Sequence, residues 1–461
     1  MLRIAVVGAG PSGFFLVEKL LSQDTTPVAV DLFERLPTPY GLVRYGVAPD
    51  HEKIRNVTRS FDKAAGRAGF RFFGNVDVGT HLSLDDLRRF YHQVCFTTGA
   101  QTDRHMGIPG EDLPGSHAAT EFVAWYNGHP DYRDRVFDLS AERVAVVGVG
   151  NVAVDVARIL CRTPEELATT DIADHALEAL RTSRVKEVYL LGRRGPAQAA
   201  FTNPEVKELG ELEGADVCAR ADEVELDPLS AAVLAREDDA TTRKKIDILR
   251  SYAERARTGK PRLLTIRFLV SPVALLEHNG RVGGIRLVRN RLVEGVDGEL
   301  KAVAGEETED LPVELVFRSV GYRGVALPGL PFDERRGVVP NESGRVVDRL
   351  TSEGSPLLGL YVSGWIKRGP SGVIGTNKPD AAETAESMLA DARAGQTLAP
   401  EGHDIAPLVR ERQPDVVEWP DWQRLAEHEA GLGKPSGRPR VKCTTVGDML
   451  AVMRKDLGLR T

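Results

Sequence analysis

Two glycine-rich turns constrain the fold of this chain more than any other feature of its sequence. GAGPSG at 8–13 follows the apolar run 2–7, and GVGNVA at 148–153 follows the apolar run 143–147. Each turn leads into a segment with the apolar spacing of a helix. A strand, a tight glycine turn and a helix begin the βαβ unit that binds a dinucleotide. The sequence therefore predicts an α/β chain with two Rossmann-like, three-layer dinucleotide-binding domains.

The first turn has the full spacing of a dinucleotide site. Gly8 permits the tight turn, Gly10 lets a pyrophosphate approach the backbone, and Gly13 lets the helix pack closely on the strand. The free N–H groups at the start of the helix would face the phosphates. The second strand of the unit, 28–33, ends at Glu34, whose carboxylate can accept both hydroxyls of an adenosine ribose.

The second unit ends differently from the first. Its turn carries Gly148 and Gly150, with Ala153 at the third position, and its second strand ends in Arg193 and Arg194. A ribose 2′-phosphate carries about two negative charges and is bound well by the paired N–H donors of arginine. The arginines therefore predict NADP(H) rather than NAD(H), a solvated basic strand end being the alternative. The simplest division places FAD in the first unit, with hydride passing to the flavin where the domains meet.

The chain is predicted to cross between the two domains twice. A Gly- and Pro-rich segment at 94–115 would leave the first domain, and a second exit lies near 315–324. The resulting limits are 1–104 with 322–461 for a discontinuous FAD-binding domain, and 105–321 for an NADP-binding domain.

Composition excludes several classes of protein. A formal net charge of -7 argues against general nucleic-acid binding, and no apolar stretch approaches a membrane span. The four cysteines lie far apart without a CxxC, which disfavours a redox dithiol or a bound iron–sulfur cluster and suits a reducing, cytoplasmic compartment. The first residues run straight into a strand, so we expect no signal peptide. Nothing reads as a symmetric interface, so we expect a monomer.

With these motifs identified, the chain resembles the adrenodoxin-reductase-like ferredoxin–NADP⁺ reductases, two-dinucleotide-domain flavoproteins with a glutathione-reductase-like fold. The resemblance covers most of the chain and implies an enzyme that passes hydride from NADPH to FAD, then single electrons to an iron–sulfur ferredoxin, reversibly. Its most specific segments are GAGPSGFF (8–15), LPTPYGLVRYGVAPDH (36–51), GNVAVDVARIL (150–160), GRRGPAQAAF (192–201) and GWIKRGPSGVIGTNK (364–378).

The resemblance also implies the site residues. Trp365 would lie beside the isoalloxazine and nicotinamide rings, and a helix beginning near Thr376 would meet the carbonyl end of the flavin. The expected cofactor-binding residues are Gly8, Gly10, Pro11, Ser12, Gly13, Glu34, Gly41, Leu42, Val47, Gly99, Trp365, Gly372, Val373, Ile374 and Thr376 on the flavin side, and Gly148, Gly150, Asn151, Val152, Arg193, Arg194 and Glu205 on the NADP side.

Three residues are candidates for a part in the redox step itself. His51 and Glu208 match a pair proposed in the family to lie near the redox centre, and Trp365 is the third candidate. His51 could instead be an ordinary hydrogen-bonding loop histidine, Glu208 a solvated acid on a short helix, and Trp365 a packing residue. Hydride transfer needs no strong acid or base, so ring alignment should dominate the rate.

One strand departs from the family pattern. The crossover strand is usually of the kind YDAVVLATGA, and here it reads YHQVCFTTGA, with Gln93 inside it. The glycine turn survives at Gly99, so a strand of the flavin domain is still expected. Gln93 could lie at a sheet edge, or the packing around it could differ.

The electron partner is expected to be an acidic ferredoxin, which would need a local basic face on this acidic chain. The segment Arg243–Arg262 carries eight basic residues and matches the region that family members use towards ferredoxin; a solvated helix face is the alternative. Two other functions stay open: an NADPH diaphorase or quinone reductase with a small-molecule acceptor, and a non-catalytic FAD/NADPH redox sensor. A disulfide reductase is disfavoured by the missing CxxC.

Overall fold

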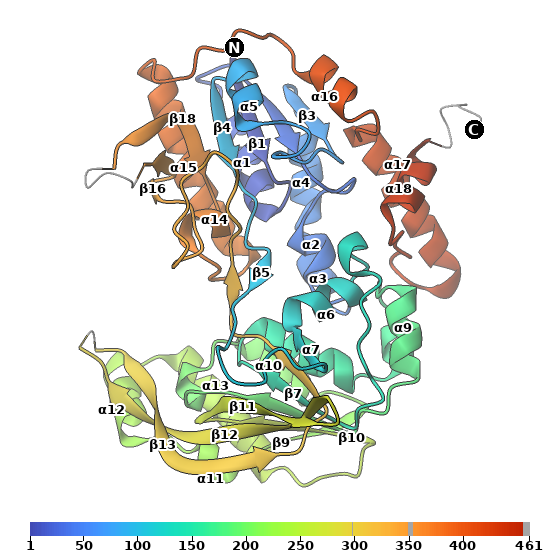
Figure 1. The fold of residues 1–461 in the computed structure, drawn as a ribbon, viewed down its shortest axis with the longest axis vertical. Coiled ribbons are helices and arrows are strands. Elements are labelled where there is room, and N and C mark those ends of the chain that lie inside the picture. Colours follow the sequence, from blue (N-terminus) through green and yellow to red (C-terminus); the bar gives the residue numbers. More distant parts are fainter. Residues whose placement is uncertain (297, 349–353, 455–461) are drawn as a thin grey trace. The chain divides into compact units, whose positions relative to one another are not determined.

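The computed structural model describes residues 1–296, 298–348 and 354–454, which form two compact units. Each unit is an α/β fold built on one mainly parallel sheet (Figure 1). Unit 1 comprises Met1–Val47, His51–Thr102 and Gly321–Thr461, and unit 2 comprises Ala48–Asp50 and Asp103–Val320.

The three residues Ala48–Asp50 belong to unit 2 by their contacts, although the chain on both sides of them belongs to unit 1. The carboxylate of Asp50 accepts hydrogen bonds from Arg158 Nε at 2.8 Å and from Arg162 Nε at 2.7 Å. Both arginines lie on or just after the first long helix of unit 2. A charged anchor therefore fixes this short loop to the second unit.

Unit 1 is built on a seven-stranded sheet in the order β16-β17-β18-β4-β1-β2-β3. The strands β3, β2, β1, β4 and β18 run parallel, and β16 and β17 form an antiparallel edge. Its strands are β1 (Leu2–Val7), β2 (Val28–Phe33), β3 (Phe70–Phe73), β4 (Gln93–Phe96), β16 (Asn341–Glu342), β17 (Arg345–Val347) and β18 (Pro356–Val362).

Both faces of this sheet are buried. Along β1, Ile4 and Val6 pack with the core that includes α1, α4, α15 and α17, whereas Ala5 and Val7 pack with the core that includes α5 and α16. Successive strand residues point to opposite faces, so a run of apolar residues requires cover on both. The helices are α1 (Pro11–Ser22), α2 (Leu42–Tyr45), α3 (Glu52–Arg55), α4 (Thr58–Ala65), α5 (Leu84–Phe90), α14 (Trp365–Arg368), α15 (Asn377–Arg393), α16 (Ala406–Arg412), α17 (Trp419–Gly433) and α18 (Val446–Arg454).

Two helices, α17 over Trp419–Gly433 and α18 over Val446–Arg454, form the C-terminal part of the described chain. The aromatic ring of Phe14 on α1 packs against Phe61 of α4 and against Trp419 of α17.

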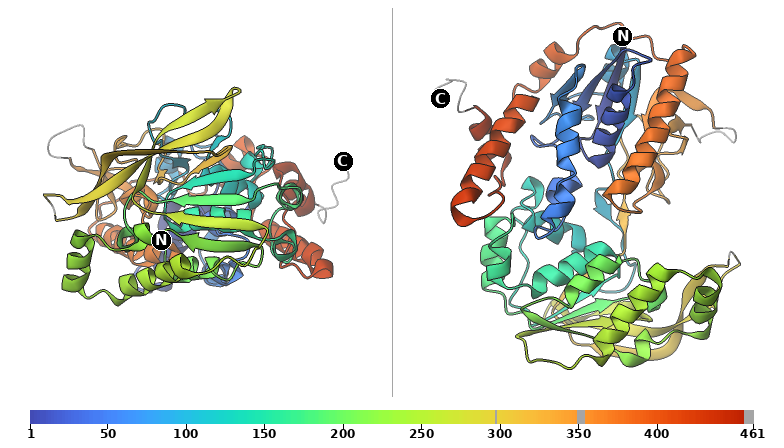
Figure 2. Two further views of the ribbon diagram at one scale, coloured as in Figure 1. Left: turned by 90° about the horizontal axis from the view of Figure 1, so that it is seen from below. Right: turned by 180° about the vertical axis from the view of Figure 1, so that it is seen from behind.

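Unit 2 is built on a six-stranded parallel sheet in the order β6-β14-β7-β8-β10-β9, whose strands lie side by side in Figure 2. Its strands are β6 (Ser116–Ala118), β7 (Arg143–Val147), β8 (Glu187–Leu191), β9 (Ala215–Ala219), β10 (Arg262–Arg267) and β14 (Leu315–Arg318). Its helices are α6 (Ala119–Tyr126), α7 (Asn151–Cys161), α8 (Pro164–Leu167), α9 (Asp174–Arg181), α10 (Asn203–Leu209), α11 (Ala221–Val224), α12 (Pro228–Glu237) and α13 (Ala240–Glu254).

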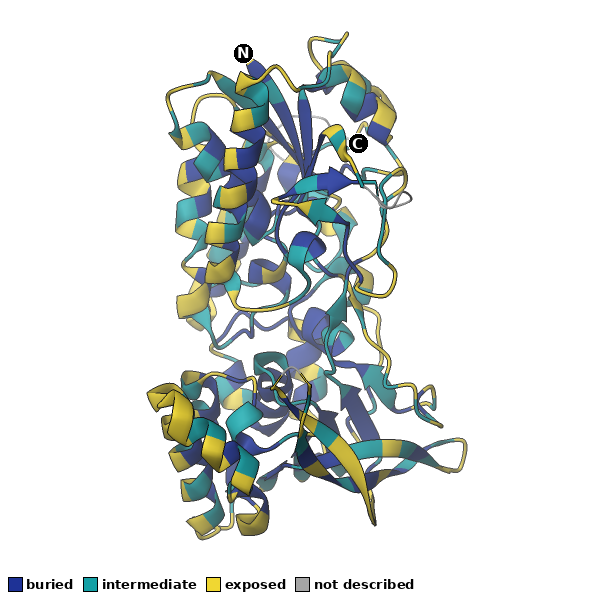
Figure 3. Ribbon diagram, turned by 90° about the vertical axis from the view of Figure 1, so that its left-hand side faces the viewer, coloured by how far each residue is buried: buried dark blue, intermediate teal, exposed yellow. Residues whose placement is uncertain are grey.

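The two faces of the second sheet are covered by different kinds of layer. Val144 and Val146 of β7 pack in the core formed with helices such as α6 and α7, whereas Ala145 and Val147 pack against a three-stranded antiparallel sheet. This third layer consists of β11 (Val270–His278), β12 (Arg281–Glu294) and β13 (Leu300–Leu311). The hairpin β12–β13 carries many exposed residues, in contrast to the buried strands of the parallel sheets (Figure 3).

Gln93 lies in the middle of the first sheet, not at an edge. Its strand β4 pairs with β1 on one side and β18 on the other, and the side chain is fully buried. Its amide nitrogen donates to Met388 O at 2.7 Å and to Tyr361 Oη at 3.2 Å. The edge interpretation of this strand is therefore wrong, and the polar side chain is accommodated by hydrogen bonds to α15 and β18.

The chain passes between the units through two short strands that form their own two-stranded sheet. These are β5 (Thr102–Asp103) and β15 (Tyr322–Arg323), and Thr102 Oγ1 donates to Arg323 O at 3.1 Å. The chain thus leaves unit 1 after Thr102 and returns to it at Gly321. The division into an FAD-binding and an NADP-binding domain stays a prediction.

Candidate functional site

The turns predicted to bind FAD follow strands of unit 1 that end together. Val7 of β1 is in register with Phe33 of β2 and Phe96 of β4, and Phe96 is in register with Val362 of β18. The residues that follow these four strand ends therefore lie along one edge of the sheet. The carboxyl edge of a parallel sheet is where such folds bind ligands.

The first and third glycines of GAGPSG are required by the protein itself. Gly8 has φ +108°, and a Cβ placed on it would lie 2.8 Å from Thr97 O. A Cβ on Gly13 would lie 2.2 Å from Gly8 O. A Cβ on Gly10 would meet no heavy atom within 4 Å. Because packing does not require glycine at position 10, the open space there fits the approach of a pyrophosphate to the backbone.

Glu34 lies beside this turn and is held by backbone donors. One carboxylate oxygen accepts from Ala9 N at 2.9 Å, and the other accepts from Leu36 N at 3.1 Å. Burial raises the pKa of Glu34, and these two N–H groups partly oppose that shift. The backbone N–H of Arg35 also donates to this carboxylate. A carboxylate has about four acceptor sites, so Glu34 retains acceptor capacity for a ribose hydroxyl.

The segment 40–47 crosses the same turn. Tyr40 N donates to Ala9 O at 2.7 Å, and a Cβ on Gly41 would lie 3.1 Å from the Cα of Gly10. Tyr40 has φ +83°, which is strained for a bulky residue. Its hydroxyl donates to Asp62, and burial together with this bond raises the pKa of Tyr40. Tyr40 was not predicted from the sequence, and its side chain anchors the strained turn that brings Gly41 close to Gly10.

The remaining predicted residues of this segment lie around α2. Leu42 is exposed, and Val47 is half-buried. Arg44, on the same helix, is buried and forms a two-pronged ion pair with Glu429 of α17, at 2.6 and 2.9 Å. The C-terminal helix α17 thus fixes the short helix that carries Leu42.

Trp365 begins the short helix α14, after Ser363 and Gly364. Its indole nitrogen donates to Ser371 O at 3.2 Å, and its ring centroid lies 5.4 Å from that of Tyr322. The ring is half-buried, so part of it can contact a ligand. Trp365 is therefore held in place by its own loop and by one aromatic neighbour.

A buried network that sequence analysis missed braces this loop. Asp380 of α15 accepts from Gly364 N at 2.5 Å and from Ser363 Oγ at 3.2 Å, and its second oxygen pairs with Lys367 Nζ at 3.0 Å. Ser363 Oγ also accepts from Ser12 Oγ at 2.9 Å. The GAGPSG turn and the tryptophan loop are therefore joined by a direct hydrogen bond. An acid in the first turn of the helix predicted near Thr376 was the available signal.

The residues just before α15 are open to solvent. Gly372, with φ +80°, and Thr376 are exposed, and the apolar side chain of Val373 is 51% exposed. Within the described part of the chain, the N–H groups of Gly372 and Val373 donate no hydrogen bond. An apolar side chain beside free backbone donors fits the edge of a planar heteroaromatic ring. Gly99, with φ +75°, likewise has open space around it.

The second turn repeats the geometry of the first in unit 2. Gly148 has φ +134°, and a Cβ on it would lie 2.2 Å from Ser319 O, whereas a Cβ on Gly150 would meet no heavy atom within 4 Å. Asn151 and Val152 begin α7, and Asn151 Oδ1 accepts from Thr202 N at 2.9 Å. The second glycine is again the one that packing does not require. The turn therefore fits a second pyrophosphate.

Arg193 and Arg194 lie beside the second turn. Val147 of β7 is in register with Leu191 of β8, so the residues after both strands share one edge of the sheet. Arg193 is exposed and Arg194 half-buried, and neither side chain has a hydrogen-bond or ion-pair partner among the residues that the structure describes. Two guanidinium groups without a protein carboxylate are suited to bind a phosphate.

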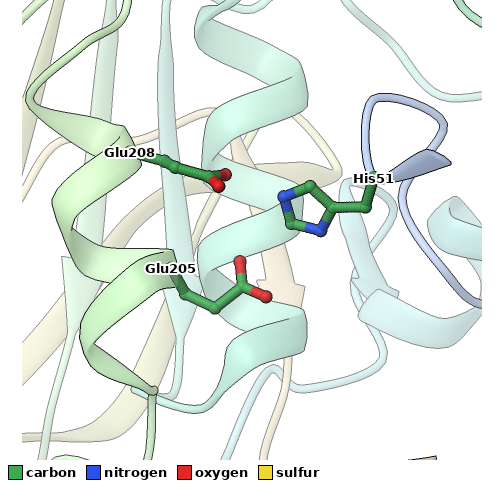
Figure 4. A group of neighbouring side chains, drawn as sticks. All are labelled: His51, Glu205 and Glu208. Atoms are coloured by element: carbon green, nitrogen blue, oxygen red, sulfur yellow. The ribbon is translucent and has the colours of Figure 1, made fainter. Parts of the chain in front are cut away.

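Glu205 and Glu208 project from the same side of α10 (Figure 4). Both carboxylates pair with one buried arginine, Arg158 of α7. The side chain of Arg158 is fully buried and lies 3.2 Å from Glu205, 3.9 Å from Glu208, 2.7 Å from Asp155 and 2.8 Å from Asp50. Burial alone would lower the pKa of Arg158, but the charges of Asp155 and Asp50 raise it well above its usual value.

This network gives Glu205 a structural partner, and its predicted role at NADP(H) stays a prediction. His51, also drawn in Figure 4, is the residue before α3 in unit 1. Its redox role and that of Glu208 likewise stay predictions.

Within the described residues, no helix is both long and apolar enough to cross a membrane.

The chain has two doubly wound units, and each carries a glycine turn at the carboxyl edge of its parallel sheet. This arrangement is typical of proteins with two dinucleotide-binding folds. No family model matches the chain. NADPH-ferredoxin reductase FprA of Mycobacterium tuberculosis is 47% identical over 464 residues, covering 97% of this chain and 98% of that protein. Mitochondrial NADPH:adrenodoxin oxidoreductase of Salvelinus fontinalis is 40% identical, covering 98% of this chain and 91% of that protein.

A solved structure, Mycobacterium tuberculosis FprA in complex with NADPH, matches with a TM-score of 0.91 at 45% identity, covering 98% of this chain and 99% of the other. The chain therefore belongs to the adrenodoxin-reductase-like ferredoxin–NADP⁺ reductase family. The fold class and family predicted from the sequence are confirmed.

Proposed function

We propose that the protein is an NADPH:ferredoxin oxidoreductase that binds FAD in unit 1 and NADP(H) in unit 2. The observation that carries the proposal is that the residues after β2 and after β8, which hold equivalent places in the two units, carry opposite charges. Glu34 stands beside the first open glycine turn, and Arg193 with Arg194 stands beside the second. An acid suits a ribose diol, and a pair of unpaired arginines suits a ribose 2′-phosphate. The related FprA structure holds NADPH.

FAD bound there would supply the redox chemistry, because a flavin can take up two electrons as hydride and release them singly to an iron–sulfur protein. The chain's own residues bind and orient the reactants. Gly41, Leu42 and Val47 on one side, and the backbone of 372–374 on the other, are proposed to enclose the flavin. Trp365 is proposed to pack beside its ring, and the start of α15 to face its carbonyl end, where a helix N-terminus favours negative charge.

His51, Glu205 and Glu208 are proposed to act at the NADP(H) side of the redox centre by positioning. The ion pairs of Glu205 and Glu208 with Arg158 support a positioning role, since they hold both carboxylates against a buried, fixed side chain. The electron acceptor must carry its own cluster, because this chain has four cysteines without cluster spacing, two of them buried.

Anaerobic stopped-flow mixing of the purified yellow protein tests the proposal. NADPH is expected to bleach the flavin band about 100-fold more efficiently than NADH, because the 2′-phosphate gains charge-assisted hydrogen bonds from two arginines. The reduced protein should then pass electrons to an acidic ferredoxin faster than to a small quinone.

Three results of this experiment would count against the proposal. Equal bleaching by NADPH and NADH would show that the protein does not select NADP(H) over NAD(H). Faster turnover with the quinone would favour a diaphorase. A protein that purifies without flavin, or is bleached by neither nucleotide, would remove the reductase proposal and favour a redox sensor.

Ferredoxin docking is proposed at the segment Arg243–Arg262, and the structure narrows the residues available there. Lys244 and Arg257 are exposed and have no hydrogen-bond or ion-pair partner in the described part of the chain. The other basic residues of the segment bind other parts of unit 2: Lys245 donates to Ala199 O, Arg243 pairs with Asp238, Arg250 with Glu225, and Arg255, Lys260 and Arg262 donate to backbone carbonyls.

The double substitution Lys244→Glu with Arg257→Glu is therefore expected to raise the KM for an acidic ferredoxin about tenfold at low salt, with NADPH reduction of the flavin unchanged. Steady-state assays over a range of salt should show a shallower salt dependence than in the wild-type protein. Lys63→Glu is the control, at a lysine of α4 that is exposed and has no partner among the described residues. An equal effect of the control would show that net charge, and not this segment, governs docking.

A further inference from the structure

Three irregular features of unit 2 converge on the backbone of Gly192–Arg194, the loop that carries the two arginines. The first is a buried amide on β12, the second an interruption of β12 pairing beside that amide, and the third a strained residue between β10 and β11. None of them is required by the parallel sheet itself. Irregularities of this kind gather where a side chain must be aimed or a loop fixed.

The amide belongs to Asn290, whose side chain is almost fully buried. Its nitrogen donates one hydrogen to Arg193 O at 2.8 Å and the other to Ser271 Oγ at 2.8 Å. Its backbone N–H donates to Leu269 O at 2.7 Å. All three donor hydrogens of Asn290, two on the side-chain amide and one on the backbone, therefore bind at one place, where the loop Gly192–Arg194 meets the start of β11.

The pairing of β12 is shifted at this point. In the ladder between β12 and β13 the register changes between Val288 and Asn290. On the facing strand, a Cβ on Gly305 would lie 2.8 Å from Arg289 O, so glycine allows the two strands to approach there. A bulge turns the following side chain away from the regular alternation. The amide of Asn290 can thereby reach the loop after β8, outside its own sheet.

Leu269 is the strained residue. Its φ is +56°, a region that bulky side chains rarely adopt. In this conformation Leu269 N donates to Arg194 O at 3.1 Å, and Val270 N donates to Gly192 O at 3.0 Å. All three carbonyls of the loop Gly192–Arg194 are therefore hydrogen-bonded to the junction formed by Leu269, Val270 and Asn290, while both guanidinium groups remain unpaired.

We propose that Asn290 is a positioning residue for nucleotide specificity, which fixes the backbone of Arg193 so that its guanidinium group is preorganised for the ribose 2′-phosphate of NADP(H). The inference rests on the proposed function, because it assumes that Arg193 binds that phosphate. A fixed backbone removes conformational freedom that the arginine would otherwise lose on binding. The antiparallel sheet β11–β13 thus contributes to the preference for NADPH over NADH through the side chain of Asn290.

The test uses the FAD-containing protein and two nucleotide probes, adenosine 2′,5′-bisphosphate and ADP, measured by titration calorimetry. Asn290→Ala is expected to weaken the 2′,5′-bisphosphate about tenfold and to leave ADP within about twofold, because only the former carries the 2′-phosphate. The NADPH/NADH ratio of kcat/KM should fall by the same factor through KM. Asn127→Ala, which removes an equally buried amide bonded to Val123 O in unit 2, is the matched control.

A double-substitution cycle with Arg193→Gln separates positioning from general loss of structure. If Asn290 acts through Arg193, Asn290→Ala changes the affinity for 2′,5′-bisphosphate less than twofold in the Arg193→Gln background. Asn290→Ser is the second variant, to be used if Asn290→Ala does not fold. Equal weakening of both probes, additive effects, or an unchanged 2′,5′-bisphosphate affinity would overturn the proposal.

The same cycle distinguishes failure of this inference from failure of the proposed function. If Arg193→Gln itself leaves the 2′,5′-bisphosphate affinity unchanged, the arginine does not read the phosphate, and both proposals fall. If Arg193→Gln weakens binding but Asn290→Ala does not, only the positioning role is wrong.

Discussion

Replacing Gly10 by valine is expected to give a folded protein that binds no flavin. A Cβ at this position meets no heavy atom within 4 Å, and the backbone at φ −81°, ψ −174° is extended and open to any residue. The valine branches would fill the space that a pyrophosphate needs. The purified variant should be colourless, with the far-ultraviolet circular dichroism of the wild type and a lower Tm, since ligand stabilisation is lost.

Two further glycines serve as controls for this prediction. Gly150→Val changes the equivalent position of unit 2, so that protein should remain yellow but no longer be bleached by NADPH. Gly13→Ala places a Cβ 2.2 Å from Gly8 O and is expected to prevent folding of unit 1 altogether. Stoichiometric FAD in the Gly10 variant would mean that unit 1 does not bind the cofactor through this turn.

The double substitution Arg193→Gln with Arg194→Gln is expected to abolish the preference for NADPH over NADH. Each arginine offers charge-assisted hydrogen bonds, of about 1.5–3 kcal/mol each, to a phosphate that only NADPH carries. The ratio of kcat/KM for the two nucleotides should therefore fall on the order of 10²-fold, almost entirely through KM for NADPH. Steady-state diaphorase assays with an artificial acceptor measure this ratio without ferredoxin.

The fold of the double arginine variant should be intact, because neither side chain pairs with a residue in the described part of the chain. An unchanged Tm and an unchanged rate with NADH are the internal controls. If the preference for NADPH survives in a folded variant, the arginines form a solvated basic strand end, and another part of unit 2 must read the phosphate.

Much of the fold could be predicted from local patterns. A strand, a glycine turn and a helix follow one another without interruption at both dinucleotide units, so GxGxx(G/A) spacing was sufficient to find β1–α1 and β7–α7. The family and fold class are confirmed. The antiparallel layer β11–β13 was not predicted, because its strands are typical of many folds and nothing local indicates which face of the second sheet they cover.

The candidate site was predicted only in part, for a related reason. Gly10, Glu34 and Arg193 are recognisable because each has a fixed offset from a strand end. Asp380 and Asn290 were missed, because each acts on a loop that lies far away in sequence and is reached only through packing. In the basic segment Arg243–Arg262 the sequence predicted too many residues for docking, since six of its eight basic side chains bind other parts of unit 2.

The sequence by itself determined which chemistry the chain can recognise: open glycine turns for phosphates, an acid at one strand end and arginines at the other. These choices are local, because a turn and the strand end beside it are set by residues within one βαβ unit. Only the tertiary structure decided which side chains hold those groups in place. Tyr40, Asp380 and Asn290 act through contacts across the fold, and the energy of such contacts depends on burial and geometry that no spacing along the chain encodes.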